Sequence, residues 1–189
     1  WAKSVRADRK VIISDCLDSH PHAEVIRVDP LDMKVYFARW AHARHYLKDH
    51  PMMDLILFTD GTDVTMLREP WDSMARGRVY IGDEPTNVGN AWMRNNMRDP
   101  RVRAFIKANP DLPLLNAGVI GGSVGDVENF LSDMLAVYYA NPNQGTGDNG
   151  ALNITAYSER QLATIEHGPH VTNEFKSYQD NGTCWFAHK

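Results

Sequence analysis

The sequence has few cysteines, no long apolar run and no large excess of one charge. Its two cysteines, Cys16 and Cys184, are too few for a disulfide framework and form no metal-ligand pattern. No apolar run of about 18 residues occurs, so we expect no membrane-spanning helix. The formal net charge of −4 gives no basic field, so we expect no nucleic acid among the partners.

Composition and length indicate a soluble, globular chain. Hydrophobic residues make up 43% and charged residues 23% of the sequence, which is the usual balance for such proteins. At 189 residues, we expect one domain covering 1–189. No signal peptide is recognisable, which favours the cytoplasm over the secretory lumen. The chain starts at Trp1 rather than at a methionine, so we expect that an upstream segment was removed.

The stretch Asp54–Leu67, DLILFTDGTDVTML, carries the clearest chemical signal. Four apolar residues, Leu55–Phe58, are typical of a strand buried on both faces, as in a parallel sheet. Asp60 and Asp63 follow it with Gly61 between them, and ligands of α/β sheets bind at such strand ends. Two carboxylates so close together repel each other unless a cation lies between them, and Mg²⁺ or Mn²⁺ prefers such oxygen ligands. An ordinary turn is the alternative, because Asp, Gly and Thr are common turn formers.

The remaining pattern alternates strands and helices. A strand, a long helical crossover and a second strand make a parallel α/β unit. We therefore expect an α/β fold with a mostly parallel central sheet flanked by helices. The expected helices cover 1–10, 31–48 and 126–140, and the expected strands cover 11–14, 24–28, 55–58, 79–81, 114–123, 162–165 and 184–187.

Two further segments carry polar or glycine-rich signals. The strand LLNAGVIGGS, Leu114–Ser123, contains three glycines, which indicate either a close approach of a ligand or a bulge. A polar loop at 141–150 contains Asp148 and leads into a helix. Basic residues gather in two places, where they form either a solvated helix face or a surface for a polyanionic acceptor: Lys3, Arg6, Arg9 and Lys10, and Arg94, Arg98, Arg101, Arg103 and Lys107.

Taken together, these motifs resemble the nucleotide-sugar glycosyltransferases of the GT-A fold, a Rossmann-like fold. LILFTDGTDV is similar to their Asp-x-x-Asp motif, as in the glycosyltransferase domains of collagen lysyl hydroxylases and related viral enzymes. LLNAGVIGGS is similar to their Asn-(Ala/Ser)-Gly strand, and CWFAHK to the strand that precedes a third metal ligand. GDNGALN is similar to a later Asp-(Asp/Gln) pair that opens a helix, with Asn149 where glutamine is commoner. The resemblance runs from Lys34 to the end of the chain. The family's first strand, which precedes a helix such as 1–9 and helps to hold the nucleotide base, is not in this chain.

The resemblance implies a set of site residues. The metal ligands would be Asp60, Asp63 and His188, with His167 and His170 as alternatives to His188. The donor would be a nucleoside-diphosphate sugar, with a UDP-sugar favoured, and its binding residues would be Lys34, Asp60, Gly61, Asn116, Ala117, Gly118 and Asn149. A solvated side chain remains the alternative for Lys34, and a strand-end cap for Asn116.

The reaction needs a divalent ion to neutralise the leaving diphosphate, and an inverting enzyme also needs a carboxylate to deprotonate the acceptor. Asp148 is the first candidate, followed by Asp83 and Glu84; the sequence leaves inversion and retention of stereochemistry open. The acceptor would be a glycan, a protein or a small molecule. Two other functions are compatible with aspartates after an apolar strand: a metal-dependent nucleotidyltransferase or phosphohydrolase, and a non-catalytic module that binds nucleotide sugars.

Overall fold

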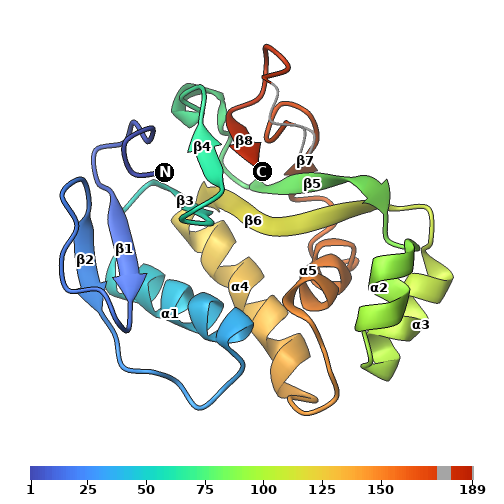
Figure 1. Cartoon of the computed structure of the whole chain (residues 1–189). Helices are drawn as coiled ribbons and strands as arrows, with labels where there is room; N and C mark the ends of the chain where they lie inside the picture. The colour runs from blue at the N-terminus through green and yellow to red at the C-terminus, as the bar shows by residue number, and fades with distance from the viewer. Residues whose placement is uncertain (174–179, 189) are drawn as a thin grey trace.

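A four-stranded sheet forms the centre of the computed structural model, which describes residues 1–173 and 180–188 (Figure 1). In sheet order its strands are β3 (Leu55–Thr59), β6 (Pro113–Ser123), β5 (Val79–Asn87) and β7 (Ile165–His167). β6 runs antiparallel to both β3 and β5, whereas β5 and β7 are parallel. The domain is therefore α/β with a mixed sheet, and the expected mostly parallel sheet is not confirmed. A strand buried on both faces has the same apolar pattern whichever way it runs, so the pattern cannot give its direction.

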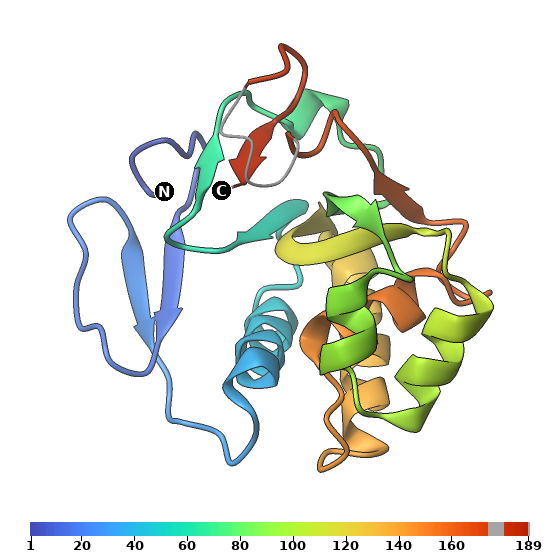
Figure 2. The same ribbon diagram turned by 45° about the vertical axis from the view of Figure 1, so that its right-hand side comes forward.

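Three helices cover one face of this sheet (Figure 1). They are α1 (Val35–Asp49), α4 (Val124–Tyr139) and α5 (Asp148–Ala156). Their apolar sides and the facing strand residues form the largest core cluster, which includes Phe37, Leu47, Ile81, Ile120, Phe130, Met134 and Leu152. Two shorter helices, α2 (Ala91–Asn96) and α3 (Pro100–Ala108), lie next to α5 in both views (Figures 1 and 2).

A small two-stranded sheet packs over the opposite face of the central sheet. Its strands, β4 (Val64–Met66) and β8 (Phe186–His188), are antiparallel, and Val64 is paired with His188. Their apolar side chains form a second cluster with Tyr80 and Val119 of the central sheet. A short 3₁₀ turn (Trp71–Ser73) follows β4. The pairing brings the end of the described chain back to the residues that follow β3.

The N-terminal segment differs from the expectation. Residues 1–10 form turns rather than a helix, because their polar groups make tertiary contacts with β4 instead. The Ser4 hydroxyl accepts a hydrogen bond from Met66 N at 3.1 Å, and Arg6 N donates to Met66 Sδ at 3.2 Å. β1 (Val11–Ser14) and β2 (Glu24–Arg27) then form a separate parallel pair beside α1 (Figures 1 and 2). Tertiary contacts outweigh helix propensity here.

The strand before the aspartates is confirmed in position but not in burial. All residues of β3 are half-buried, and within the described residues β3 pairs only with β6. The strand is therefore at an edge of the central sheet rather than in its middle. Other boundaries moved: β5 continues to Asn87 past two irregularities, β7 begins at Ile165, and β8 begins at Phe186. No helix in the described part of the chain has the length and apolar character needed to cross a bilayer.

Asp99 ties the short helices to the loop before α5. It caps α3, and its side chain is 0% exposed. Burial by itself raises the pKa of Asp99, but hydrogen bonds from Arg101 and from the Thr146 hydroxyl outweigh burial and hold that pKa at about 2. The distances are 2.6 Å from Arg101 Nη2 and 2.5 Å from Thr146 Oγ1, both to Oδ2. Arg101 also donates to the carbonyl of Val137 in α4 at 2.7 Å.

We predict that Asp99→Ala lowers the free energy of unfolding by about 2 kcal/mol, because it removes the cap of α3 and leaves the buried Thr146 hydroxyl without its acceptor. Since the folded pKa is below the ordinary value of 3.8, the contribution of Asp99 is present above that value and is lost as the pH falls through about 2. Urea denaturation at pH 7 and at acidic pH measures both effects. The exposed Asp111, changed to Asn, is the control, and equal stabilities of the two variants would contradict the prediction.

Candidate metal centre

Two carboxylates and one imidazole converge where β3 ends. Asp60 follows β3 directly, and its backbone N–H donates to the carbonyl of Gly118 at 2.9 Å, which fixes the turn against β6. Asp63 precedes β4, and His188 is the residue of β8 that pairs beside it. His188 Nε2 is 4.0 Å from Asp60 Oδ2 and 3.9 Å from Asp63 Oδ2. The three potential ligand atoms lie within 4.8 Å of one another.

A glycine in β6 makes room for the imidazole. The His188 ring lies against the backbone of Gly118, and a Cβ at that position would overlap its Cε1, Nε2 and Nδ1 atoms. Because the obstruction involves a ring held by a paired strand, a side chain at Gly118 would push His188 away from the aspartates. The close approach expected of this glycine-rich strand is thus an approach of His188.

The protonation of His188 suits a metal ligand. The residue is 2% exposed, and this burial lowers its pKa, although Asp63 and Asp60 act in the opposite direction. A neutral imidazole nitrogen with two carboxylates is a donor set that binds divalent cations. Asp63 Oδ1 is also buried and accepts no hydrogen bond from any described residue. The three residues therefore fit a divalent ion in both composition and spacing.

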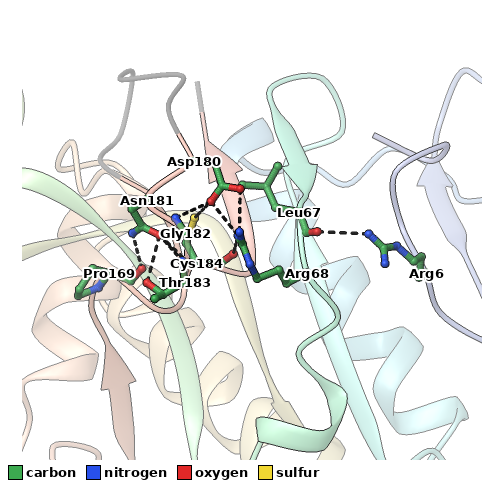
Figure 3. A network of polar contacts seen from close by, with 9 residues as sticks. All are labelled: Arg6, Leu67, Arg68, Pro169, Asp180, Asn181, Gly182, Thr183 and Cys184. Carbon is green, nitrogen blue, oxygen red and sulfur yellow. Dashed lines mark hydrogen bonds and ion pairs between the residues drawn. The ribbon is translucent and has the colours of Figure 1, made fainter.

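A polar network holds the loop that leads into β8 (Figure 3). Arg68 forms a forked ion pair with Asp180, at 2.7 Å from Nη1 to Oδ1 and 2.8 Å from Nη2 to Oδ2. Arg68 Nη1 also donates to the carbonyl of Cys184 at 2.9 Å. The side-chain oxygen Oδ1 of Asn181 accepts from the backbone N–H groups of Thr183 and Cys184. These contacts fix the path of the chain just before His188.

Arg39 of α1, which no pattern in the sequence marked, joins the candidate metal centre to α5. Its Nη1 donates to Asp60 Oδ1 at 2.5 Å, and its Nη2 donates to Asp148 Oδ2 at 2.8 Å. Asp148 is the first residue of α5, so Arg39 brings that helix end to the aspartates. Nothing in the helical pattern of 31–48 distinguishes Arg39 from a solvated arginine.

Side-chain amides bind the backbone of β6 at the site. Asn116 donates from Nδ2 to Glu84 Oε1 and accepts at Oδ1 from Gly118 N, both at 2.7 Å. Asn149 accepts from Ala117 N at 3.3 Å. Asn153, also missed from the sequence, is fully buried and both donates to and accepts from the backbone of Leu115. The amides thus fix α5 against β6.

Adjacent acids in β5 lie on opposite faces of the sheet. Glu84 reaches Asn116, but Asp83 turns the other way, because successive strand residues alternate. Asp83 Oδ1 is 3.0 Å from His167 Nδ1, so the structure brings Glu84 and Asp148 to the site and leaves Asp83 apart. His167 and His170 are outside the cluster of three ligands; the His170 ring instead packs against Trp185.

Two other expected binding residues make few contacts. Lys34 is exposed at the start of α1. Its backbone N–H donates to Tyr138 Oη at 3.3 Å and its carbonyl accepts from the N–H groups of Phe37 and Ala38, whereas its ammonium group makes no contact among those described. Gly61 is exposed in the turn between the aspartates. No atom of another segment lies within 4 Å of the position that a Cβ would occupy there. Either position is open to a ligand from solvent.

We predict that His167 makes stability depend on pH. The hydrogen bond with Asp83 raises the pKa of His167 above its ordinary value of 6.5, against the effect of burial. The resulting stabilisation is fully present below pH 6.5 and is lost as the pH rises through the raised pKa. Between pH 6 and pH 9, the free energy of unfolding of His167→Gln, measured by denaturation, should change less than that of the wild type. His45→Gln, which removes an exposed histidine, should behave like the wild type; an unchanged pH dependence in His167→Gln would contradict the prediction.

Comparison with known proteins adds no relative. No family model matches the chain, and no curated protein matches it significantly. The convergence of Asp60, Asp63 and His188, with the polar groups around them, is the feature that points to a function.

Proposed function

We propose that the chain is a metal-dependent glycosyltransferase that moves a sugar from a nucleoside-diphosphate sugar to an acceptor hydroxyl. The observation that carries this proposal is the convergence of Asp60, Asp63 and His188 beside the Asn116–Gly118 segment of β6. Mn²⁺ is the favoured ion, because the donor set adds an imidazole nitrogen to carboxylate oxygens, and Mg²⁺ is the alternative. A UDP-sugar is the favoured donor, and a glycan, protein or small molecule is the acceptor.

The chemistry needs positive charge where the diphosphate leaves. When bound, a divalent ion supplies that charge as a Lewis acid. Asp60, Asp63 and His188 would hold such an ion, with carboxylate oxygens and an imidazole nitrogen as the ligands. The turn that carries Gly61 is exposed between the two aspartates and is open to the diphosphate. Lys34, exposed at the start of α1, is assigned to the diphosphate from the sequence resemblance.

The carboxylates differ in how many of their oxygens are already bonded. Both oxygens of Asp148 accept hydrogen bonds, Oδ2 from Arg39 and Oδ1 from Asn149 N. Glu84 accepts through Oε1 alone in the described contacts, which leaves Oε2 for a substrate hydroxyl. We therefore assign deprotonation of the acceptor to Glu84 in an inverting reaction, and we assign to Asp148 the orientation of sugar hydroxyls.

We predict that Asp63→Ala abolishes metal-dependent binding of UDP or GDP while the fold stays intact. The variant removes one of the two carboxylates and breaks no hydrogen bond among the described residues. Isothermal titration of each nucleotide with and without Mn²⁺ measures the effect, and circular dichroism measures the fold. The exposed Asp72, changed to Ala, is the control. Unchanged affinity in Asp63→Ala, or metal-independent binding by the wild type, would refute the site.

We predict that Glu84→Gln lowers kcat for transfer by about 100-fold, because it removes the proton acceptor but keeps the shape of the side chain. Nucleotide affinity in the presence of Mn²⁺ should change little. A panel of nucleotide sugars, followed for transfer and for slow donor hydrolysis, first identifies the donor. The exposed Glu159→Gln is the control, and a larger loss of kcat in Asp148→Asn than in Glu84→Gln would reverse the assignment.

A further inference from the structure

The acids at the candidate site come from distant parts of the chain. Because their like charges repel, a cation that bonds to both would hold them together. Asp60 follows β3, and Asp148 begins α5. Among the described contacts, Arg39 is the residue that bonds to both, through separate nitrogens of one guanidinium group. Its Cζ lies 4.4 Å from the centre of the Trp40 ring, so the group is held from a third side.

Arg39 also decides which oxygen of Asp60 faces the site. Oδ1 is bonded to Arg39, and Oδ2 is the oxygen that lies 4.0 Å from His188 Nε2. Ligating carboxylates are usually oriented by such outer partners, whose loss weakens metal binding by about 10–100-fold. The bond from Arg39 therefore leaves Asp60 with one oxygen turned toward Asp63 and His188.

We propose that Arg39 is a positioning residue that clamps Asp60 and Asp148 together and so couples divalent-ion affinity to the start of α5. The proposal rests on the proposed function, since it takes Asp60 as a metal ligand. The clamp needs a planar fork with two nitrogens that reach different acids. Lysine carries the same charge on a single nitrogen and cannot reproduce this geometry.

A positive charge near a cation site has an opposite effect that the test must separate. If Arg39 acted only through its charge, it would repel a divalent ion, and removing that charge would tighten binding. If Arg39 acts as a clamp, any variant without the fork weakens binding, whatever its charge. Lys and Gln variants therefore give different results under the two explanations.

The experiment measures the affinity for Mn²⁺ alone, from the electron paramagnetic resonance signal of the free ion. We expect Arg39→Lys to weaken Mn²⁺ binding about tenfold and Arg39→Gln to weaken it at least as much. Arg44→Lys is the matched control: Arg44 is on the same helix, its side chain is 31% exposed against 35% for Arg39, and it pairs with Glu128 at 2.8 Å away from the site. This control should bind Mn²⁺ like the wild type. It should lose about as much thermal stability as Arg39→Lys does. Wild-type affinity in Arg39→Lys, or tighter binding in Arg39→Gln, would overturn the clamp.

A double-mutant cycle with Asp148→Asn tests the coupling itself. If Asp148 acts on the ion through Arg39, Asp148→Asn weakens Mn²⁺ binding in the wild type but has little further effect in Arg39→Lys. Additive effects would show that Asp148 acts by charge alone and would overturn the coupling. A wild type that binds no Mn²⁺ would refute both the proposed function and the clamp. Binding that is lost in Asp63→Ala but unchanged in Arg39→Lys would refute the clamp alone.

Discussion

Repulsion between carboxylates at the end of β3 is the constraint on which the candidate site depends. Asp60, Asp63 and Asp148 lie in a half-buried region, where charges interact more strongly than in water. In the protein alone, Arg39 is the cation that two of them share. Burial lowers the pKa of His188 and so favours its neutral form. Among the described residues, Asp63 is the one of these three carboxylates that pairs with no arginine or lysine, so a divalent ion would compensate its charge most directly.

β6 contacts three of the segments that carry the residues of the site. Its backbone accepts from Asp60 N at Gly118, and it is bonded at Leu115 and Ala117 by amides of α5. The absence of a side chain at Gly118 lets His188 approach from the opposite face of the sheet. One strand thus sets the relative positions of β3, α5 and β8, three segments that are distant in the sequence.

The sequence could predict those parts of the site that follow short-range rules. Asp60 and Asp63 follow an apolar strand with a glycine between them, and His188 follows a second apolar run, so strand ends marked all three. Arg39 could not be found in this way, because its role depends on how α1 packs beside β3 and α5. The antiparallel direction of β6 could not be predicted either, because the apolar pattern of a buried strand does not depend on its direction. The opposite orientations of Asp83 and Glu84 could have been predicted from the sequence. If the expected strand had continued past Ile81, the alternation of strand residues would have placed the two acids on opposite faces of the sheet.

The two carboxylates near β6 show why contacts, rather than residue type, assign a chemical role. Asp148 was the first candidate for a base because GDNGALN resembles the glycosyltransferase segment that opens a helix and borders the reaction centre. Its oxygens are already bonded to Arg39 and to Asn149 N, which makes it a fixed part of the site. A general base must be able to reach the proton that it takes and then hold it. In the proposed reaction Glu84 would meet this need, because its Oε2 accepts no hydrogen bond from a described residue and its bond to Asn116 holds it on the face of β6 that His188 contacts.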